Sequence, residues 1–298
     1  MIKRTLFFGN PVYLSTKNEQ ILIQFPEEEK ENRSVSIEDI GMVILENRQI
    51  TITNGLIDKL NSNNVAIVTC NQQYMPTGLL MNLVGHSEQT ERHFKQVEAS
   101  QPLKKNLWQQ TIQAKIKNQA KHLYERGVEV DNMLYWAKQV NSGDTMNHEA
   151  RAAAYYWKTL FDLPAFKRHR FGEPPNNLLN YGYAILRSIT ARALIGSGLL
   201  PCLGIHHRNK YNAYCLADDI MEPYRPYVDL IVYHIVDSCE EVTDLTTEIK
   251  KELLQLPALD VIIDAKKSPL MVAMSRTTNS LYECYAGIAR KVLYPEYE

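Results

Sequence analysis

Cysteine is scarce in this chain of 298 residues, which contains only five copies. They are odd in number and scattered, and no two of them form a C-x-x-C pair. A disulfide framework or a thiolate zinc site needs closer grouping. We therefore expect reduced, mostly buried thiols, as is usual for free cysteine. The five positions are Cys70, Cys202, Cys215, Cys239 and Cys284.

Long apolar runs are also missing. No stretch reaches the roughly 18–20 residues that a membrane-spanning helix needs. Near the N-terminus, Lys3 and Arg4 precede an apolar stretch that is too short for a signal peptide. Hydrophobic residues make up 45% of the chain and charged residues 22%, which excludes a wholly disordered or fibrous protein. We expect a soluble, cytoplasmic protein with one large or two ordinary domains.

The formal net charge of −1 hides an uneven distribution of charge along the chain. Residues 86–215 contain 18 lysines and arginines but 10 acidic residues, whereas residues 216–298 contain 8 and 15. A polyanion partner would use such a basic middle, because phosphate affinity depends on local contacts rather than on total charge. The alternative is a solvated helix face. The densest basic positions are Lys104, Lys105, Lys115, Lys117, Lys121 and the run Lys167-Arg168-His169-Arg170.

The predicted organisation changes near residue 85. Before it, β-branched and apolar runs over 21–25, 41–45 and 65–69 predict short strands. Thr53 is a candidate N-cap for one interrupting helix that covers residues 54–60. This segment therefore reads as a small β-rich domain.

After residue 88 the pattern is helical. An apolar stripe that includes Trp108, Ile112 and Lys115 predicts a helix that Gly127 can end. Further helices are expected over 146–162, 177–196, 219–236, 245–255 and 269–292, while 260–264 is ambiguous between strand and loop. We predict an α+β protein, with a β-rich N-terminal domain (1–85), a polar linker (86–100) and a larger all-helical C-terminal domain (101–298).

Three segments carry residues suited to chemistry. In the first, Glu149 lies near the start of an alanine-rich stretch, 147–157, that favours a helix. In the second, His206 and His207 follow Gly204, and histidine is a frequent metal ligand or proton carrier. The alternatives are an exposed glutamate favoured by the helix dipole and a polar loop with two partly exposed rings.

The third segment, 216–226, contains Asp219 and Glu222, which share one face if it is helical. Two such carboxylates repel unless a cation or proton lies between them. Arg225 is one turn further on, where it can orient Glu222 or hold a phosphate. Pro223 and Pro226 fit only near a helix start. The alternative is an acidic first turn that complements the helix dipole.

These residues together form a set of oxygen ligands with one imidazole. Such a set suits Mg²⁺ or Mn²⁺ better than structural zinc. A basic surface beside it suggests phosphodiester chemistry, in which a metal polarises the phosphate.

The order of the motifs resembles a known family. Glu149 is followed by the stretch Asn-Asn-Leu-Leu-Asn-Tyr-Gly-Tyr at 176–183, then Gly-Ile-His-His at 204–207, then Asp-Ile-Met-Glu-Pro-Tyr-Arg-Pro at 219–226. This series resembles the first-numbered CRISPR-associated protein, the integrase and endonuclease of CRISPR adaptation. The resemblance spans nearly the whole chain, and the last stretch is most similar to members from type II systems.

The resemblance implies a metal-dependent DNA nuclease of antiviral defence that inserts DNA fragments as new spacers. The 3′-hydroxyl of the fragment attacks a phosphodiester at the edge of the repeat. The resemblance makes Glu149, His207 and Glu222 the catalytic metal ligands, with Asp219 as a further ligand or a supporting residue. Two candidates for the general base stay open, His206 and a water on the metal. Asn176 and Tyr183 match the motif between the ligands, as structural or DNA-proximal residues.

The resemblance also implies partners. These are double-stranded DNA, a second copy of the chain contacted through the β-rich domain, and the small second-numbered CRISPR-associated protein. The family often has Gly and Arg where this chain has Ala150 and Ala154, so a phosphate contact would come from Arg151 or Arg208 instead. The candidates for DNA contact are Lys104, Lys105, Lys167, Arg168, Arg170, Arg208 and Arg225.

Two other functions remain open from the sequence. One is a metal-dependent nuclease acting on branched DNA without an integration role. The other is a non-catalytic DNA-binding scaffold in which the acidic and histidine residues are structural.

Overall fold

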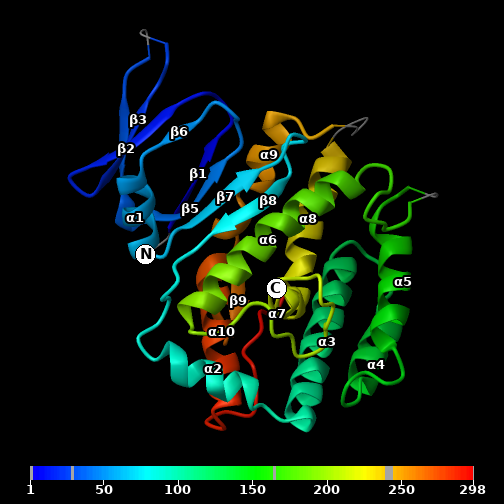
Figure 1. The fold of residues 1–298 in the computed structure, drawn as a ribbon. Coiled ribbons are helices and arrows are strands. Elements are labelled where there is room, and N and C mark those ends of the chain that lie inside the picture. The colour runs from blue at the N-terminus through cyan, green and yellow to red at the C-terminus, as the bar shows by residue number, and fades with distance from the viewer. Residues whose placement is uncertain (1–2, 28–29, 164–165, 239–243, 298) are drawn as a thin grey trace. The chain divides into compact units, whose positions relative to one another are not determined.

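The structure, a computed structural model, describes residues 3–27, 30–163, 166–238 and 244–297 (Figure 1). Its contacts divide the chain into two compact units, Met1–Gly85 and His86–Glu298. Within the described ranges, no helix combines the length and apolar character that crossing a membrane requires. Cys215 and Cys284 are buried free thiols, whereas Cys202 is exposed. Cys239 lies outside the described residues.

The first unit contains two four-stranded sheets. One has the order β1-β5-β7-β8, in which β8 is antiparallel to β7 and the other pairs are parallel. The other has the order β4-β3-β2-β6, with β6 parallel to β2 and the rest antiparallel. The strands are β1 (Arg4–Phe8), β2 (Tyr13–Lys17), β3 (Gln20–Gln24), β4 (Arg33–Ser36), β5 (Ile40–Leu45), β6 (Thr51–Ile52), β7 (Ala66–Cys70) and β8 (Pro76–Leu80).

Sequence pattern accounts for the elements of this unit. Strand β5 is apolar at nearly every position because it is buried between two parallel neighbours. Helix α1 (Asn54–Ser62) begins after Thr53, whose side chain accepts a hydrogen bond from the backbone N–H of Leu56. The three predicted strands match β3, β5 and β7 within one residue. The 3₁₀ turn η1 (Ile37–Asp39) leads into β5.

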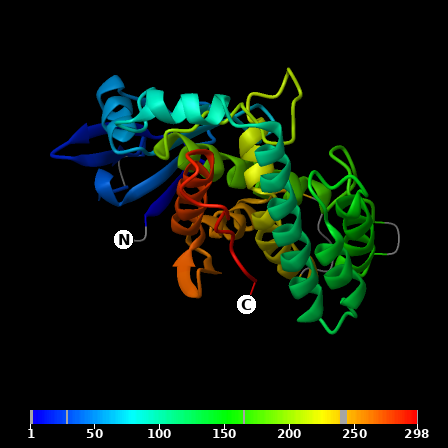
Figure 2. The ribbon, with the colours of Figure 1, turned by 90° about the horizontal axis from the view of Figure 1, so that it is seen from below.

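The second unit is built mainly from helices. They are α2 (Gln89–Val97), α3 (Gln101–Tyr124), α4 (Asp131–Gln139), α5 (His148–Leu160), α6 (Asn176–Gly196), α7 (Cys215–Ile220), α8 (Arg225–Ser238), α9 (Thr247–Leu253) and α10 (Leu270–Tyr285), with the 3₁₀ turns η2 (Glu222–Tyr224) and η3 (Leu256–Ala258). Helix α6 is buried along most of its length and packs against α8 and α10 (Figure 1). Helix α3 packs against α4, α5, η2 and α8. The last residues of the chain follow α3, as Figure 2 shows in red and green.

The prediction that this unit is all-helical is wrong. Residues 260–269 form an antiparallel hairpin of β9 (Asp260–Ile263) and β10 (Lys266–Pro269). Asp264 and Ala265 both have positive φ angles, 53° and 54°, as a two-residue hairpin turn with φ above zero at both positions requires. Ala265 gave no turn signal in the sequence, because alanine seldom occupies that region.

The expected linker, 86–100, holds α2 and belongs to the second unit. Its polar composition was misleading, since two of its polar side chains are buried. Arg92 donates to the carbonyl of Ser197 at 3.1 Å, and Gln96 donates to that of Leu200 at 3.0 Å. These contacts satisfy carbonyl groups just beyond the end of α6.

The helix expected over 219–236 is divided at its prolines. Helix α7 ends at Ile220, the turn η2 follows, and α8 starts at Arg225. Pro223 and Pro226 thereby occupy the first turn of η2 and of α8, where the missing N–H costs no helical hydrogen bond. The break moves Glu222 onto a tight turn rather than a long helix.

Buried His122 makes stability sensitive to acid. Its ring is 1% exposed, and Nδ1 lies 3.0 Å from the Tyr156 hydroxyl. Burial, helped by the positive charge of Arg126, lowers the pKa of His122 to about 3. The unfolded chain takes up this proton near pH 6.5 and the folded chain does not until pH 3, so stability falls as the pH drops through that window.

We expect the His122→Gln variant to remove this contribution. It amounts to about 2 kcal/mol between pH 6.5 and 4.5, from about 1.36 kcal/mol per pH unit. Urea unfolding at the two pH values measures it, with His169→Gln as the control because His169 is exposed. Equal losses of stability in the wild type and in His122→Gln would contradict the expectation.

Candidate metal centre

The structure brings two of the predicted ligands, Glu149 and Glu222, to a single point. The Lys115 ammonium lies 2.6 Å from Glu149 Oε1 and 2.7 Å from Glu222 Oε2. Lys115 lies on α3, Glu149 on α5 and Glu222 on η2. Two carboxylates that are 73 residues apart in the sequence therefore share one cation.

The start of α5 determines where Glu149 lies. The carboxylate of Asp144 accepts hydrogen bonds from the backbone N–H groups of His148 at 3.0 Å and Glu149 at 2.9 Å. Asn147, the residue before the helix, is in the left-handed region with a φ of 55°. Asp144 thus satisfies two N–H groups that have no helical partner. This anchor holds Glu149 in the first turn, facing Lys115.

Glu222 is buried and lies between two cations. Arg225 Nε is 2.9 Å from its Oε1, on the side opposite to Lys115. Burial alone would raise the pKa of Glu222, but Arg225 and Lys115 outweigh it and lower that pKa. Burial would lower the pKa of Lys115, but Glu222 and Glu149 together raise it above its ordinary value. Glu222 and Lys115 are therefore both charged near neutral pH.

Asp219 holds the histidine loop. It is fully buried, and its oxygens accept from the backbone N–H of His206 at 2.9 Å and of His207 at 3.2 Å. The His207 ring donates from Nδ1 to the same carboxylate at 2.5 Å, which raises the pKa of His207. Nε2 is then the ring nitrogen left to meet a ligand. In this arrangement Asp219 orients His207, whereas Glu222 lies with Glu149.

The neighbouring ring of His206 has a different environment. It stacks on Trp108 of α3 with a centroid separation of 4.1 Å and an angle of 4° between the planes. Burial lowers the pKa of His206. The two histidines therefore differ in kind, since one is bound to a carboxylate and the other rests on an aromatic ring.

A buried hydrogen-bonded cluster of Asp229, Tyr156 and Tyr183 lies two helical turns beyond the acidic pair. Asp229, seven residues after Glu222, accepts hydrogen bonds from the hydroxyls of Tyr183 and Tyr156, the latter at 3.0 Å. Tyr156 lies seven residues after Glu149 on α5. Burial raises the pKa of Asp229 to about 7 despite the two hydrogen bonds. This cluster joins α5 to α8 and so fixes the register in which the two acids meet.

The donor set suits a hard divalent cation. Two carboxylates and one imidazole nitrogen match the preferences of Mg²⁺ and Mn²⁺. The acidic pair attracts a cation in this structure, since Lys115 fills that place. Over the described ranges, no three acidic, histidine or cysteine side chains already form a metal-binding group.

The predicted DNA-contacting residues fall into two groups. Lys105, Lys167, Arg170 and Arg208 are exposed, and Lys104 is half-buried. Arg168 instead donates to Asn176 at 2.9 Å and to Asn180 at 2.8 Å, and Arg225 pairs with Glu222. Asn176 and Tyr183 have buried structural contacts in the same region. Arg168 and Arg225 are thus committed within the fold.

The role of Lys115 in the site was not predicted. It was counted with the basic surface, yet only 8% of it is exposed. The signal was its place in the apolar stripe, three residues after Ile112 and next to Ile116. A lysine on the buried face of a helix needs an acidic partner. No local pattern in the sequence marks the four other residues that support the site, which are Asp144, Trp108, Tyr156 and Asp229.

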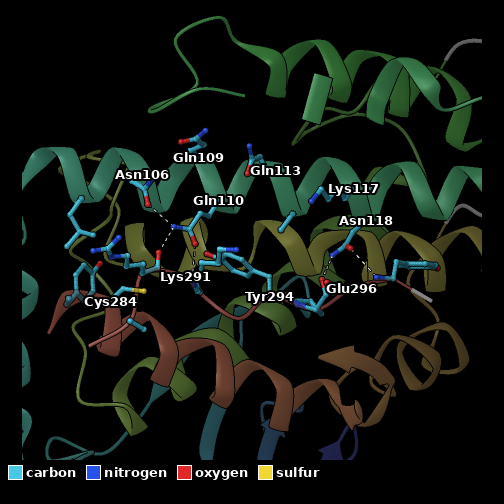
Figure 3. A pocket seen from close by; sticks show the side chains of 18 of the residues that line it. Asn106, Gln109, Gln110, Gln113, Lys117, Asn118, Cys284, Lys291, Tyr294 and Glu296 are labelled. Atoms are coloured by element: carbon cyan, nitrogen blue, oxygen red, sulfur yellow. Dashed lines mark hydrogen bonds between the residues drawn. The ribbon is translucent and has the colours of Figure 1, made fainter. Parts of the chain in front are cut away.

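A separate groove of about 1210 Å³ runs between α3 and the C-terminal residues (Figure 3). Gln110 and Asn118 hold the chain end along α3, with Gln110 accepting from the N–H of Val292 and Asn118 from that of Tyr297. Amides and cations, including Gln113 and Lys117, line the groove. The predicted metal ligands are not among its lining residues.

Comparison with known proteins gives a family match. The family model described as CRISPR associated protein Cas1 matches residues 6–255. The CRISPR-associated endonuclease Cas1 of Neisseria meningitidis serogroup C (strain 8013) is 36% identical over 293 residues, which cover 98% of this chain and 94% of that protein.

Solved structures show the same fold. A casposase bound to integration product has a TM-score of 0.80 at 21% identity, covering 100% of this chain and 95% of the other. A Cas1 protein from Thermotoga maritima has a TM-score of 0.74 at 17% identity, covering 95% and 97%. With a family match over most of its length and a close relative over nearly all of it, the chain belongs to the Cas1 family of CRISPR-associated proteins.

Proposed function

We propose that this protein is a metal-dependent DNA integrase and endonuclease of CRISPR adaptation. It inserts DNA fragments as new spacers by attack of a fragment's 3′-hydroxyl on a phosphodiester of the repeat. The observation that carries the proposal is the convergence of Glu149 and Glu222 on one cation. The names of its relatives, an endonuclease and a casposase bound to integration product, support it.

Glu149, Glu222 and Nε2 of His207 would hold Mg²⁺ or Mn²⁺. The bound metal supplies charge stabilisation for the phosphate and for the attacking or leaving oxygen. Asp219 keeps His207 in the tautomer that presents Nε2. Arg225 keeps Glu222 ionised despite its burial. Asp219 and Arg225 would thus hold two of the three ligands before substrate arrives, which reduces reorganisation during reaction.

The attacking hydroxyl must also lose a proton. His206 is a candidate acceptor, because its lowered pKa keeps the ring unprotonated near neutral pH. Its stacking on Trp108 fixes the plane of the ring. His206 would therefore contribute less than a metal ligand but more than a surface residue.

We also propose DNA, a second copy of this chain and the second-numbered CRISPR-associated protein as partners. Integration joins two 3′ ends, so it needs at least two active sites. In the described part of the chain, β1 and β8, and β4 and β6, are the edge strands of the two sheets, and such edges are where copies can pair. A Cas6-RT-Cas1–Cas2 complex has a chain of similar fold, with a TM-score of 0.72 at 19% identity over 97% of this chain and 36% of that one.

The metal-ligand assignment predicts a sharp difference between the two histidines. Glu149→Ala and His207→Ala should each reduce strand transfer at least about 100-fold, because each removes a ligand of the cation that stabilises the transition state. His206→Ala should cost less. An assay with supercoiled repeat DNA, Mn²⁺ and the partner protein measures joining, and released fragments measure cutting.

Circular dichroism is the control for folding of the three variants. A dead His206→Ala beside an active His207→Ala would contradict the assignment. Cutting of branched DNA without any joining by the wild type would favour a nuclease over an integrase.

The exposed cations predict a salt-dependent DNA interface. Replacing Lys105, Lys167 and Arg170 by alanine should weaken binding to all sequences alike. The slope of log affinity against log salt should fall by roughly one unit per lost phosphate contact. Arg168 is kept, because its loss would disturb the loop that it holds to Asn176.

The matched control is the triple alanine variant of Lys251, Lys266 and Lys267. These three lysines are also exposed but lie in the acidic C-terminal segment. Fluorescence anisotropy at several salt concentrations gives both slopes. An unchanged slope in the first variant, or an equal change in the control, would place the DNA elsewhere.

A further inference from the structure

Lys115 is a buried cation at the place where the proposed metal would lie. Its side chain is 10% exposed, and its ammonium contacts both acidic side chains, Glu149 at 2.6 Å and Glu222 at 2.7 Å. Lys115 lies on the buried face of α3, since Ile112 and Ile116 of the same helix are fully buried. The Lys115 ammonium is therefore a buried, paired part of the site and not a surface charge.

The charges of the cluster balance without a metal. Glu149 and Glu222 bring two negative charges, and Lys115 and Arg225 bring two positive charges. Arg225 contacts only the Glu222 member of the pair in the described contacts. Without Lys115, the two carboxylates would face each other with a single cation on one side, at a cost that burial increases.

A divalent metal and the ammonium compete for the same oxygens. Mg²⁺ binds carboxylate oxygen at about 2.0–2.1 Å and requires its ligands to converge. Glu149 Oε1 and Glu222 Oε2 already converge on Lys115 Nζ. Adding a metal beside the ammonium would also bring two further positive charges to four side chains whose charges already balance.

We propose that Lys115 is an internal counter-cation of the metal-free protein, and that the divalent metal binds by exchange with its ammonium group. The inference rests on the metal site proposed above. The long, flexible stem of lysine allows its head to leave while the backbone of α3 stays in place. A phosphate of bound DNA would then offer both a ligand to the metal and a partner to the displaced ammonium, so metal and DNA would favour each other's binding.

The first test compares Lys115→Met with Lys117→Met. Lys117 lies on the same helix and is exposed, so the two variants lose the same charge from the same element. Isothermal titration with MnCl₂, without DNA, measures affinity, and thermal unfolding measures stability. Lys115→Met should bind Mn²⁺ at least tenfold more tightly, melt lower without metal, and gain more in melting temperature from Mn²⁺. Lys117→Met should resemble the wild type.

The second test uses the wild-type protein and does not depend on a variant that folds. Reductive methylation followed by mass spectrometry reports how accessible each lysine is. Mn²⁺ should speed the methylation of Lys115 severalfold and leave Lys117 unchanged. This arm decides the matter if Lys115→Met is unfolded without metal.

The outcomes separate the two proposals. Mn²⁺ binding that is equal or weaker in Lys115→Met, or methylation of Lys115 that Mn²⁺ leaves unchanged, would overturn the exchange while the metal site stands. If the wild type binds no Mn²⁺, or if Glu149→Gln does not weaken the Mn²⁺ binding, both the metal site and the exchange are overturned.

Discussion

Repulsion between two carboxylates, the buried one of Glu222 and the half-buried one of Glu149, is the constraint on which the site depends. The carboxylates of Glu149 and Glu222 contact the same ammonium group, and a cation between them offsets their repulsion. Lys115 meets this need without metal, and Arg225 adds a second cation against Glu222. The same repulsion would favour a divalent ion at the site proposed above. At that site, affinity for metal and the stability of the metal-free fold would oppose each other.

The surrounding fold serves to hold the acids in register. Asp144 anchors the start of α5, and Asp229 joins α5 to α8 two turns further along. Asp219 fastens the histidine loop to α7. Each anchor is a carboxylate that accepts several hydrogen bonds, so its charge is spread over fixed donors. These anchors fix the backbone on both sides of the acids, whereas Lys115 reaches them through a long side chain.

Much of this arrangement could be predicted from the sequence, where the signal is local. Thr53 caps its helix, the strands near residues 21–25 and 41–45 form, and the prolines at 223 and 226 lie at helix starts. Family resemblance placed Glu149 and Glu222 in one site, and the structure brings them together. Lys115 was not predicted as a site residue, because its partners Glu149 and Glu222 are distant in the sequence. The hairpin at 260–269 was not predicted, because alanine seldom occupies the positive-φ turn position that Ala265 fills.

Anomalous diffraction at the manganese edge, from crystals grown with MnCl₂, tests the central claim most directly. The account predicts one strong peak within bonding distance of Glu149, Glu222 and Nε2 of His207, with the Lys115 ammonium no longer between the two acids. A peak elsewhere in the protein, or none while Lys115 still bridges the carboxylates, would contradict it.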